Sequence, residues 1–205
     1  MADDDFTFLD LACIMRIGPN TVLERFGSLI NAGFFDASAV AGSLKQKGLV
    51  EFGNTYPGLN KLLLTPKAKT LIANANAKSN DKIDALDIEI IKQLGLGRKM
   101  HFEITDLLNV RESDLALRLY KLYKQGYVFY TFKNGNPEAS LTENGFILTK
   151  KNEELTQMRM QTQNKESSNS AAKQANTPNR GPRPVDLLVI GLALLIIILF
   201  LLNKL

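Results

Sequence analysis

The sequence predicts an α+β fold of two tandem, related domains, followed by a flexible polar linker and one C-terminal transmembrane helix. Two observations carry this prediction. Residues 44–50 read LKQKGLV and residues 122–128 read LYKQGYV, so a helix that ends at glycine and enters a β-rich run occurs twice. Residues 185–202 are almost entirely apolar, whereas the linker, residues 152–184, is rich in Asn, Ser, Ala, Gln and Pro.

The first domain, residues 1–77, is expected to contain three helices, a hairpin and a last helix. The helices are predicted over residues 6–18, 21–31 and 36–48. LVEFG and NKLLLT bracket the turn TYPGL, which predicts a hairpin, and PKAKTLIANA then begins a helix with Pro66 near its first position. In an alternative parse TVLERFGSLINAGFF is the third helix; it leaves one helix before it, so we prefer the first parse.

The second domain, residues 78–151, repeats this plan with one extra strand. A helix is predicted over residues 85–95, a short strand over residues 101–104, and a brief second helix capped by Thr105 and Asp106. A third helix follows over residues 112–126. The segments YVFYTF and EASLT are predicted to be strands on either side of the Asn134-Gly135 turn, and ENGFILTKK resumes as a helix.

The last apolar stretch is long enough to cross a bilayer. As a helix, residues 185–202 would span roughly 27 Å, close to the thickness of a hydrocarbon core. Arg180 and Arg183 precede the stretch and Lys204 follows it, which predicts a single-pass tail anchor in the cell membrane with the N-terminal head in the cytoplasm. The residues expected to form the anchor are Val185, Leu187, Leu188, Val189, Ile190, Leu194, Leu195, Ile196, Ile197, Ile198, Leu199, Phe200, Leu201 and Leu202.

Little in the sequence indicates catalysis. The chain has one histidine, His101, and one cysteine, Cys13, and both are better explained as structural residues than as catalytic or metal-ligating ones. No phosphate-binding loop, nucleophile elbow or paired-cysteine metal motif occurs. A single cysteine also fits a reducing compartment. We therefore expect a protein that is not an enzyme and carries neither cofactor nor metal.

Several motifs resemble the winged helix-turn-helix of prokaryotic and archaeal regulators. LNVRESDLALRLYKLYKQGYV resembles that family's turn and recognition helix, and LTENGFIL resembles its junction between wing and last helix. LTPKA from Leu64 gives the first copy a similar junction, so the resemblance covers nearly all of residues 6–151 as two tandem copies. It implies binding to double-stranded DNA, although tandem copies also occur as protein-interaction modules, and fold alone does not decide between the two.

The second copy carries the charges that favour DNA binding. At about 100° per residue, Asp114, Arg118 and Lys121 share the helix face opposite the leucines. Arg118 is expected to contact guanine or phosphate, and the lysines to neutralise phosphates. The alternative is a solvated face on which Asp114 and Arg118 pair at i, i+4. The expected DNA-binding residues are Ser113, Asp114, Leu117, Arg118, Lys121, Lys124 and Lys133.

The first copy favours a different role. Small residues replace the arginine on its third helix, which weakens base reading and would let another backbone approach closely. The expected partner-interface residues are Ser38, Ala39, Gly42, Lys45 and Gln46. Residues 1–77 hold seven basic and seven acidic residues, and residues 78–151 hold twelve and ten, so the head lacks a strong basic excess. Three hypotheses follow: a membrane-tethered transcription regulator, a membrane-tethered protein adaptor, and a homodimer.

Overall fold

The computed structural model describes residues 5–56, 59–97, 101–152, 154 and 157–158. The chain divides into two compact units, residues 1–153 and residues 154–205, and the first of them contains every named helix and strand. Among the described residues, no helix is both long enough and apolar enough to cross a membrane. The predicted anchor over residues 185–202 and most of the predicted linker lie outside the described residues.

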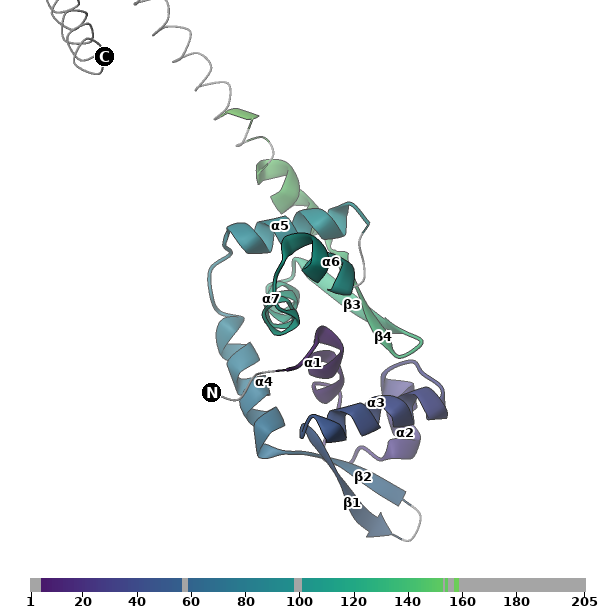
Figure 1. Ribbon diagram of the computed structural model, residues 1–205. Coiled ribbons are helices and arrows are strands. Elements are labelled where there is room, and N and C mark those ends of the chain that lie inside the picture. Colours follow the sequence, from purple (N-terminus) through teal and green to yellow (C-terminus); the bar gives the residue numbers. More distant parts are fainter. Residues whose placement is uncertain (1–4, 57–58, 98–100, 153, 155–156, 159–205) are drawn as a thin grey trace, which may run out of the picture. The chain divides into compact units, whose positions relative to one another are not determined.

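The first half follows the predicted order of elements, with its first two helices shorter than predicted and its third helix beginning two residues earlier (Figure 1). Its elements are α1 (Phe8–Ile14), α2 (Leu23–Leu29), α3 (Phe34–Gln46), β1 (Val50–Tyr56), β2 (Leu59–Leu64) and α4 (Pro66–Lys78). Helix α1 begins in a capping box, in which the Thr7 side chain accepts from the Asp10 amide and the Asp10 carboxylate accepts from the Thr7 amide. Helix α4 starts with Pro66, as predicted, and the residue before it, Thr65, is its N-cap.

The second half contains α5 (Ala85–Gly95), α6 (His101–Leu108), α7 (Glu112–Lys124), β3 (Val128–Lys133) and β4 (Asn136–Leu141), followed by a helix over residues 143–152. The predicted hairpin is confirmed. Asn134 and Gly135 lie between its strands with φ values of 50° and 80°, the left-handed pair that a two-residue hairpin turn requires.

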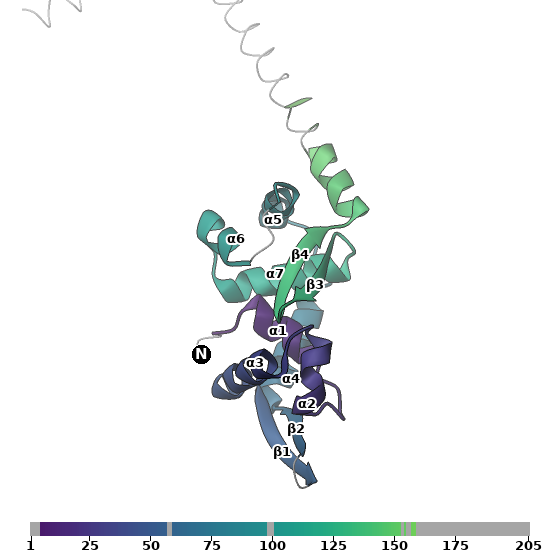
Figure 2. The same cartoon turned by 90° about the vertical axis from the view of Figure 1, so that its right-hand side faces the viewer.

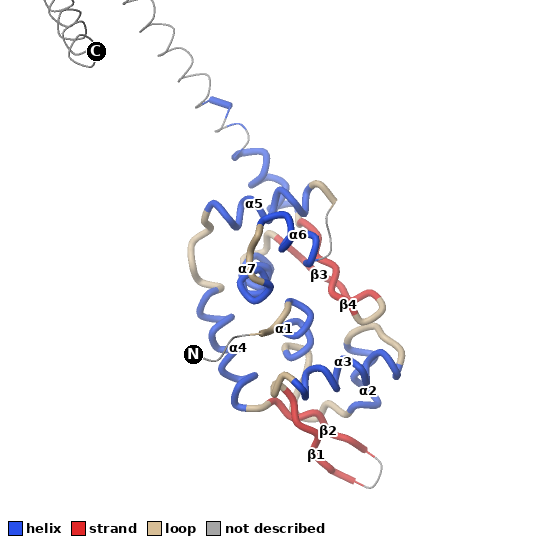
Figure 3. Tube along the Cα trace, viewed as in Figure 1, coloured by secondary structure: helices blue, strands red, loops and turns tan. Residues whose placement is uncertain are grey.

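The predicted strand over residues 101–104 is wrong, because these residues form the start of α6. Thr105 and Asp106, predicted as N-caps, lie inside this helix, and the Thr105 hydroxyl donates to the carbonyl of Phe102 at 2.8 Å. Ile104 is fully buried and Leu108, one turn later, is half-buried, so the apolar period of the segment is helical. A strand also needs a partner, and both described sheets are two-stranded hairpins (Figure 3).

The repeated phrase forms the same joint twice. Gly48 and Gly126 end α3 and α7 with positive φ values of 68° and 78°, where a residue with a Cβ would be strained. The amide that follows each glycine donates back into the helix, from Leu49 to Leu44 and from Tyr127 to Leu122, at 2.9 Å in both cases. Thr65 and Thr142 donate to the carbonyls of the two glycines at 2.7 and 2.6 Å. The echo is therefore a shared helix-to-hairpin joint.

The two halves share one hydrophobic core. Buried side chains from both halves form a single cluster, in which the ring of Phe8 on α1 meets the ring of Tyr130 on β3 edge to face at a centroid distance of 5.3 Å. Both views of the ribbon show α7 lying between α5 and α6 on one side and α1 on the other (Figures 1 and 2). The helix predicted to read DNA is thus enclosed by both halves.

Candidate functional site

Helix α7 holds the predicted DNA-binding charges, and its polar face is occupied from within the protein. Arg118, which is 14% exposed, donates from Nη1 to Asp84 at 2.8 Å and to Asp87 at 2.9 Å. Its Nε donates to Asp114 at 3.0 Å. Three carboxylates therefore surround one guanidinium. Burial opposes ionisation of Asp84, but the hydrogen bond and charge of Arg118 outweigh it and hold the pKa of that carboxyl at about 2.

Lys121 is more deeply buried than Arg118. Its side chain is 2% exposed, and its ammonium lies 2.6 Å from the carboxylate of Asp87 and 2.6 Å from the carbonyl of Lys82. Asp87 is fully buried and also accepts from the amide of Asp84, as part of the capping box that begins α5. A buried charge of this kind needs its partner, because removing one member of a buried ion pair lowers the unfolding free energy by about 3–5 kcal/mol.

Other polar groups of α7 bind the first half and the segment that joins the halves. Asp114 pairs with Lys78 of α4 at 2.9 Å, and the hydroxyl of Tyr120 donates to Asn76 at 2.8 Å. The Gln125 amide donates to the carbonyls of Ser79 and Asp81 at 2.9 and 2.8 Å. The face that the sequence assigned to DNA is thus an internal interface.

The remaining predicted DNA-binding residues are spread out. Ser113 and Leu117 are half-buried on α7, and Lys124 is exposed near its end. Lys133 is exposed on β3 and lies 3.5 Å from Glu138 of the neighbouring strand. The structure directs Arg118 and Lys121 to Asp84 and Asp87 at the start of α5 rather than toward solvent. Asp114 pairs with Arg118 on the same helix. The sequence held one signal of this pairing. The segment DALD, residues 84–87, is a helix start with two aspartates, and these carboxylates were available as partners for the cations of α7.

The hairpin of the second half is likewise used internally. The side-chain amide of Asn31 donates to the carbonyl of Phe132 at 3.1 Å, and a Cβ at Gly135 would lie 3.3 Å from the methyl of Ala32. The guanidinium of Arg16 lies 5.9 Å from the ring centroid of Phe132. The β3–β4 hairpin of the second half therefore packs against the turn between α2 and α3 of the first half.

The predicted partner-interface residues lie on α3, which keeps a free outward face. Ala39, Lys45 and Gln46 are exposed, and Ser38 and Gly42 are half-buried. A Cβ added at Gly42 would meet no atom within 4 Å, so the surface is open there. The ammonium of Lys45 lies 5.0 Å from the ring centroid of Phe52 on β1. The structure thus brings these residues together on one surface.

Two aromatic residues at the start of α3 were missed by sequence reasoning. Phe35 is 87% exposed and Phe34 is 51% exposed, and their rings meet edge to face at a centroid distance of 5.9 Å. At helical spacing Phe35, Ala39, Gly42 and Gln46 form the outward ridge of α3, opposite the buried Ala37, Ala41 and Leu44. The helix was predicted over residues 36–48 but begins at Phe34, so the two phenylalanines before Asp36 belong to it. The FF pair was the available signal in the sequence.

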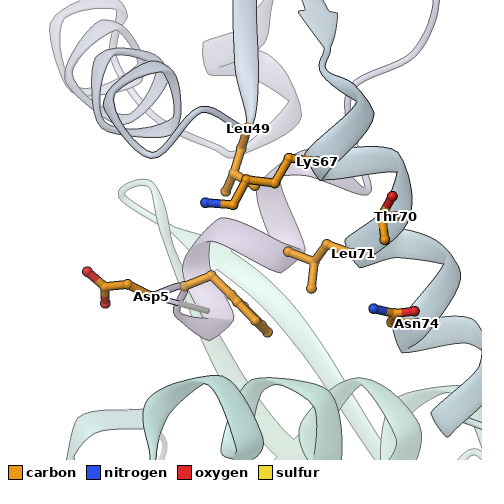
Figure 4. A pocket seen from close by; sticks show the side chains of 7 residues that line it. Asp5, Leu49, Lys67, Thr70, Leu71 and Asn74 are labelled. Atoms are coloured by element: carbon orange, nitrogen blue, oxygen red, sulfur yellow. The ribbon is translucent and has the colours of Figure 1, made fainter. Parts of the chain in front are cut away.

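A small cavity of about 200 Å³ lies between α4, the start of β1 and the N-terminal segment (Figure 4). Its lining is Asp5, Phe6, Leu49, Lys67, Thr70, Leu71 and Asn74. The ammonium of Lys67 donates to the carbonyl of Lys47 at 2.9 Å. The lining holds the carboxylate of Asp5 and the ammonium of Lys67, and no imidazole or thiol.

Burial shifts the pKa values of the cysteine and the histidine. Burial, aided by Asp10, raises the pKa of the Cys13 thiol to about 12, so the thiol stays neutral at physiological pH. Burial lowers the pKa of His101. Among the described residues, no cluster of three or more His, Cys, Asp or Glu side chains is arranged to hold a metal ion.

Comparison with models of protein families, with curated proteins and with solved structures finds no match to this chain. The winged-helix resemblance therefore stays a prediction from the sequence. What the structure describes is the order of elements in each half: three helices, a hairpin and a helix.

Proposed function

We propose that this protein is a membrane-tethered adaptor, in which two winged-helix-like halves form one head that binds a protein partner through the outward face of α3. The single observation that carries the proposal is the contrast between the two third helices. The cations of α7 are held by Asp84, Asp87 and Asp114, whereas the ridge of α3 is open to solvent and begins with Phe35.

The chemistry of the α3 ridge fits a protein better than a nucleic acid. A phenylalanine that fills a pocket contributes a large apolar area, and such aromatic anchors carry much of the binding energy at interfaces. The open surface at Gly42 and the single methyl of Ala39 allow a partner's backbone to approach closely. The ridge itself has no basic residue, and the ammonium of the neighbouring Lys45 lies over the ring of Phe52.

DNA reading by α7 would require Arg118 and Lys121 to leave three carboxylates. Phosphates would then compete with Asp84, Asp87 and Asp114, and the buried Asp87 would lose its neutralising ammonium. This cost weakens the transcription-regulator hypothesis, which stays a prediction. A titration of residues 1–153 with duplex DNA against salt tests it, because the salt slope counts the phosphates contacted.

The membrane tether rests on the sequence of residues 185–202 and on the charges that flank them. A tether would hold the head at the cytoplasmic face of the membrane and raise the local concentration of any protein recruited by α3.

The adaptor proposal is tested by crosslinked capture with the full chain in membranes, after nuclease treatment. Phe35→Ser is the test variant, and Phe129→Ser is the matched control, because Phe129 is 45% exposed on a different element, β3. We expect the full chain and the Phe129→Ser variant to retain one partner that the Phe35→Ser variant loses. Partners that disappear with nuclease, or that are unaffected by Phe35→Ser, would contradict the proposal.

A further inference from the structure

The helix over residues 143–152 packs on the second half by one side only. The amide of Gly145 donates to the hydroxyl of Thr142 at 3.2 Å, and that hydroxyl donates to the carbonyl of Gly126 at 2.6 Å. A Cβ on Gly145 would collide with the carbonyl oxygen of Tyr127, so glycine lets the helix lie directly on the backbone at the start of the hairpin. The start of the helix is thereby fixed to the head.

The opposite side of this helix exposes apolar residues beside cations. Phe146 is 52% exposed and Ile147 is 56% exposed, and Lys150 and Lys151 are exposed one turn later. Residues spaced i, i+1, i+4 and i+5 share one helix face, and the four side chains therefore lie together. Leu148 and Thr149, which point away from this face, are half-buried. We call Phe146, Ile147, Lys150 and Lys151 the amphipathic face.

We propose that the amphipathic face lies on the anionic surface of the membrane that holds the chain. Such a face suits an interface of lipid headgroups and acyl chains, where apolar side chains enter the bilayer and lysines reach anionic headgroups. Glu143, one turn before Phe146, is also exposed, and Glu153 and Glu154 directly follow the helix, so residues 143–154 carry no net positive charge. The attraction comes from the two lysines alone, is modest, and needs the apolar pair with it.

The predicted tether makes a modest attraction sufficient. The predicted polar linker separates the helix from the predicted span, and a flexible stretch of about 19 residues would have an r.m.s. reach of roughly 25 Å. The amphipathic face would then meet the membrane at an effective concentration on the order of millimolar. This step rests on the proposed tether.

The contact would orient the head. Within residues 1–153, the helix over residues 143–152 lies at one end, and α2, α3 and the β1–β2 hairpin lie at the other, in both views (Figures 1 and 2). A helix 143–152 held on the membrane would point the α3 ridge away from it, toward a partner in the cytoplasm.

The test uses tryptophan as a reporter, because the chain has none of its own. The full chain is reconstituted in vesicles with roughly one anionic phosphatidylglycerol to three phosphatidylcholine, with brominated acyl chains as the quencher. Phe146→Trp reports the amphipathic face. Phe35→Trp is the matched control, since it also replaces an exposed phenylalanine at the start of a helix, at the other end of the head. Flotation with the vesicles is measured on the same samples.

We expect both variants to float. The Phe146→Trp variant should lose about half of its fluorescence to the quencher and the Phe35→Trp variant little, because an interfacial helix buries its apolar side chains at the acyl boundary. Lys150→Glu with Lys151→Glu in the Phe146→Trp chain should reduce the quenching at least twofold.

Floating Phe146→Trp chains whose fluorescence is unquenched would overturn this inference and leave the tether standing; a protein partner on this face would give that result. Equal quenching of both reporters would also overturn it. Chains that fail to float would overturn the tether as well.

Discussion

Replacing Lys121 with methionine tests the internal role of α7 most directly. Lys121 is 2% exposed, and its ammonium has two partners at 2.6 Å, Asp87 and the carbonyl of Lys82. Methionine fills most of the volume of the lysine stem, so the cavity contribution is small. Asp87 keeps Arg118 at 2.9 Å, which places the expected loss at the lower end of the range for breaking a buried ion pair, about 3 kcal/mol of unfolding free energy.

The assay is urea unfolding of residues 1–153, followed by the helical circular dichroism signal. Lys124→Met is the matched control, an exposed lysine three residues later on the same helix, and we expect it to change the unfolding free energy by less than about 0.5 kcal/mol. Adding Asp87→Asn to Lys121→Met should cost less than the sum of the single losses, by about 2 kcal/mol, because the two groups neutralise each other.

A loss of unfolding free energy for Lys121→Met no larger than that of the Lys124→Met control would refute the internal pairing. If that variant kept its stability but lost duplex binding, Lys121 would belong to a DNA-binding surface and the transcription-regulator hypothesis would replace the adaptor.

Three further predictions follow from the same structure. The pKa of Asp84 is about 2 in the folded state and higher when unfolded, so its contribution is present above about pH 4 and lost as pH falls toward 2; because the side chain is half-exposed and screened, Asp84→Asn should remove about 1 kcal/mol or less of this pH dependence in acid unfolding. Cys13 should resist a thiol reagent at neutral pH until the head is unfolded by urea, and fast labelling of the folded head would contradict its burial. Gly145→Ala should lower the unfolding free energy of the head by about 1–3 kcal/mol, because its Cβ would collide with Tyr127. Gly42→Ala, in open space within a helix, should raise it by about 0.5–1 kcal/mol in the same urea unfolding. A change of the same sign for both variants would contradict this prediction.

The homodimer hypothesis is decided separately by sedimentation of the full chain in detergent and of residues 1–153. The α3 ridge of one copy is the first surface to examine if a dimer is found, and Phe35→Ser should then dissociate it.

Local sequence determined most of the elements, because their causes are local. Gly48 and Gly126 ended two helices, Asn134-Gly135 set a two-residue hairpin, and Pro66 opened a helix, each through the backbone angles its residue allows. The error at residues 101–104 had a related cause. A run of four residues is too short to separate a strand period from a helical one, and only packing of Ile104 against the core decided it.

Only the tertiary structure decided which charged faces are free. The helical period placed Asp114, Arg118 and Lys121 on one face of the helix. The period does not tell which other element packs against that face. Asp84 and Asp87 are some thirty residues away in sequence and reach Arg118 because α5 packs beside α7. In contrast α3, with the same place in its half, packs through its small residues Ala37 and Ala41 and leaves Phe35 exposed. Which charged groups pair depends on the distance between them in space. The sequence alone specifies that distance only for residues within a turn or two of the same helix.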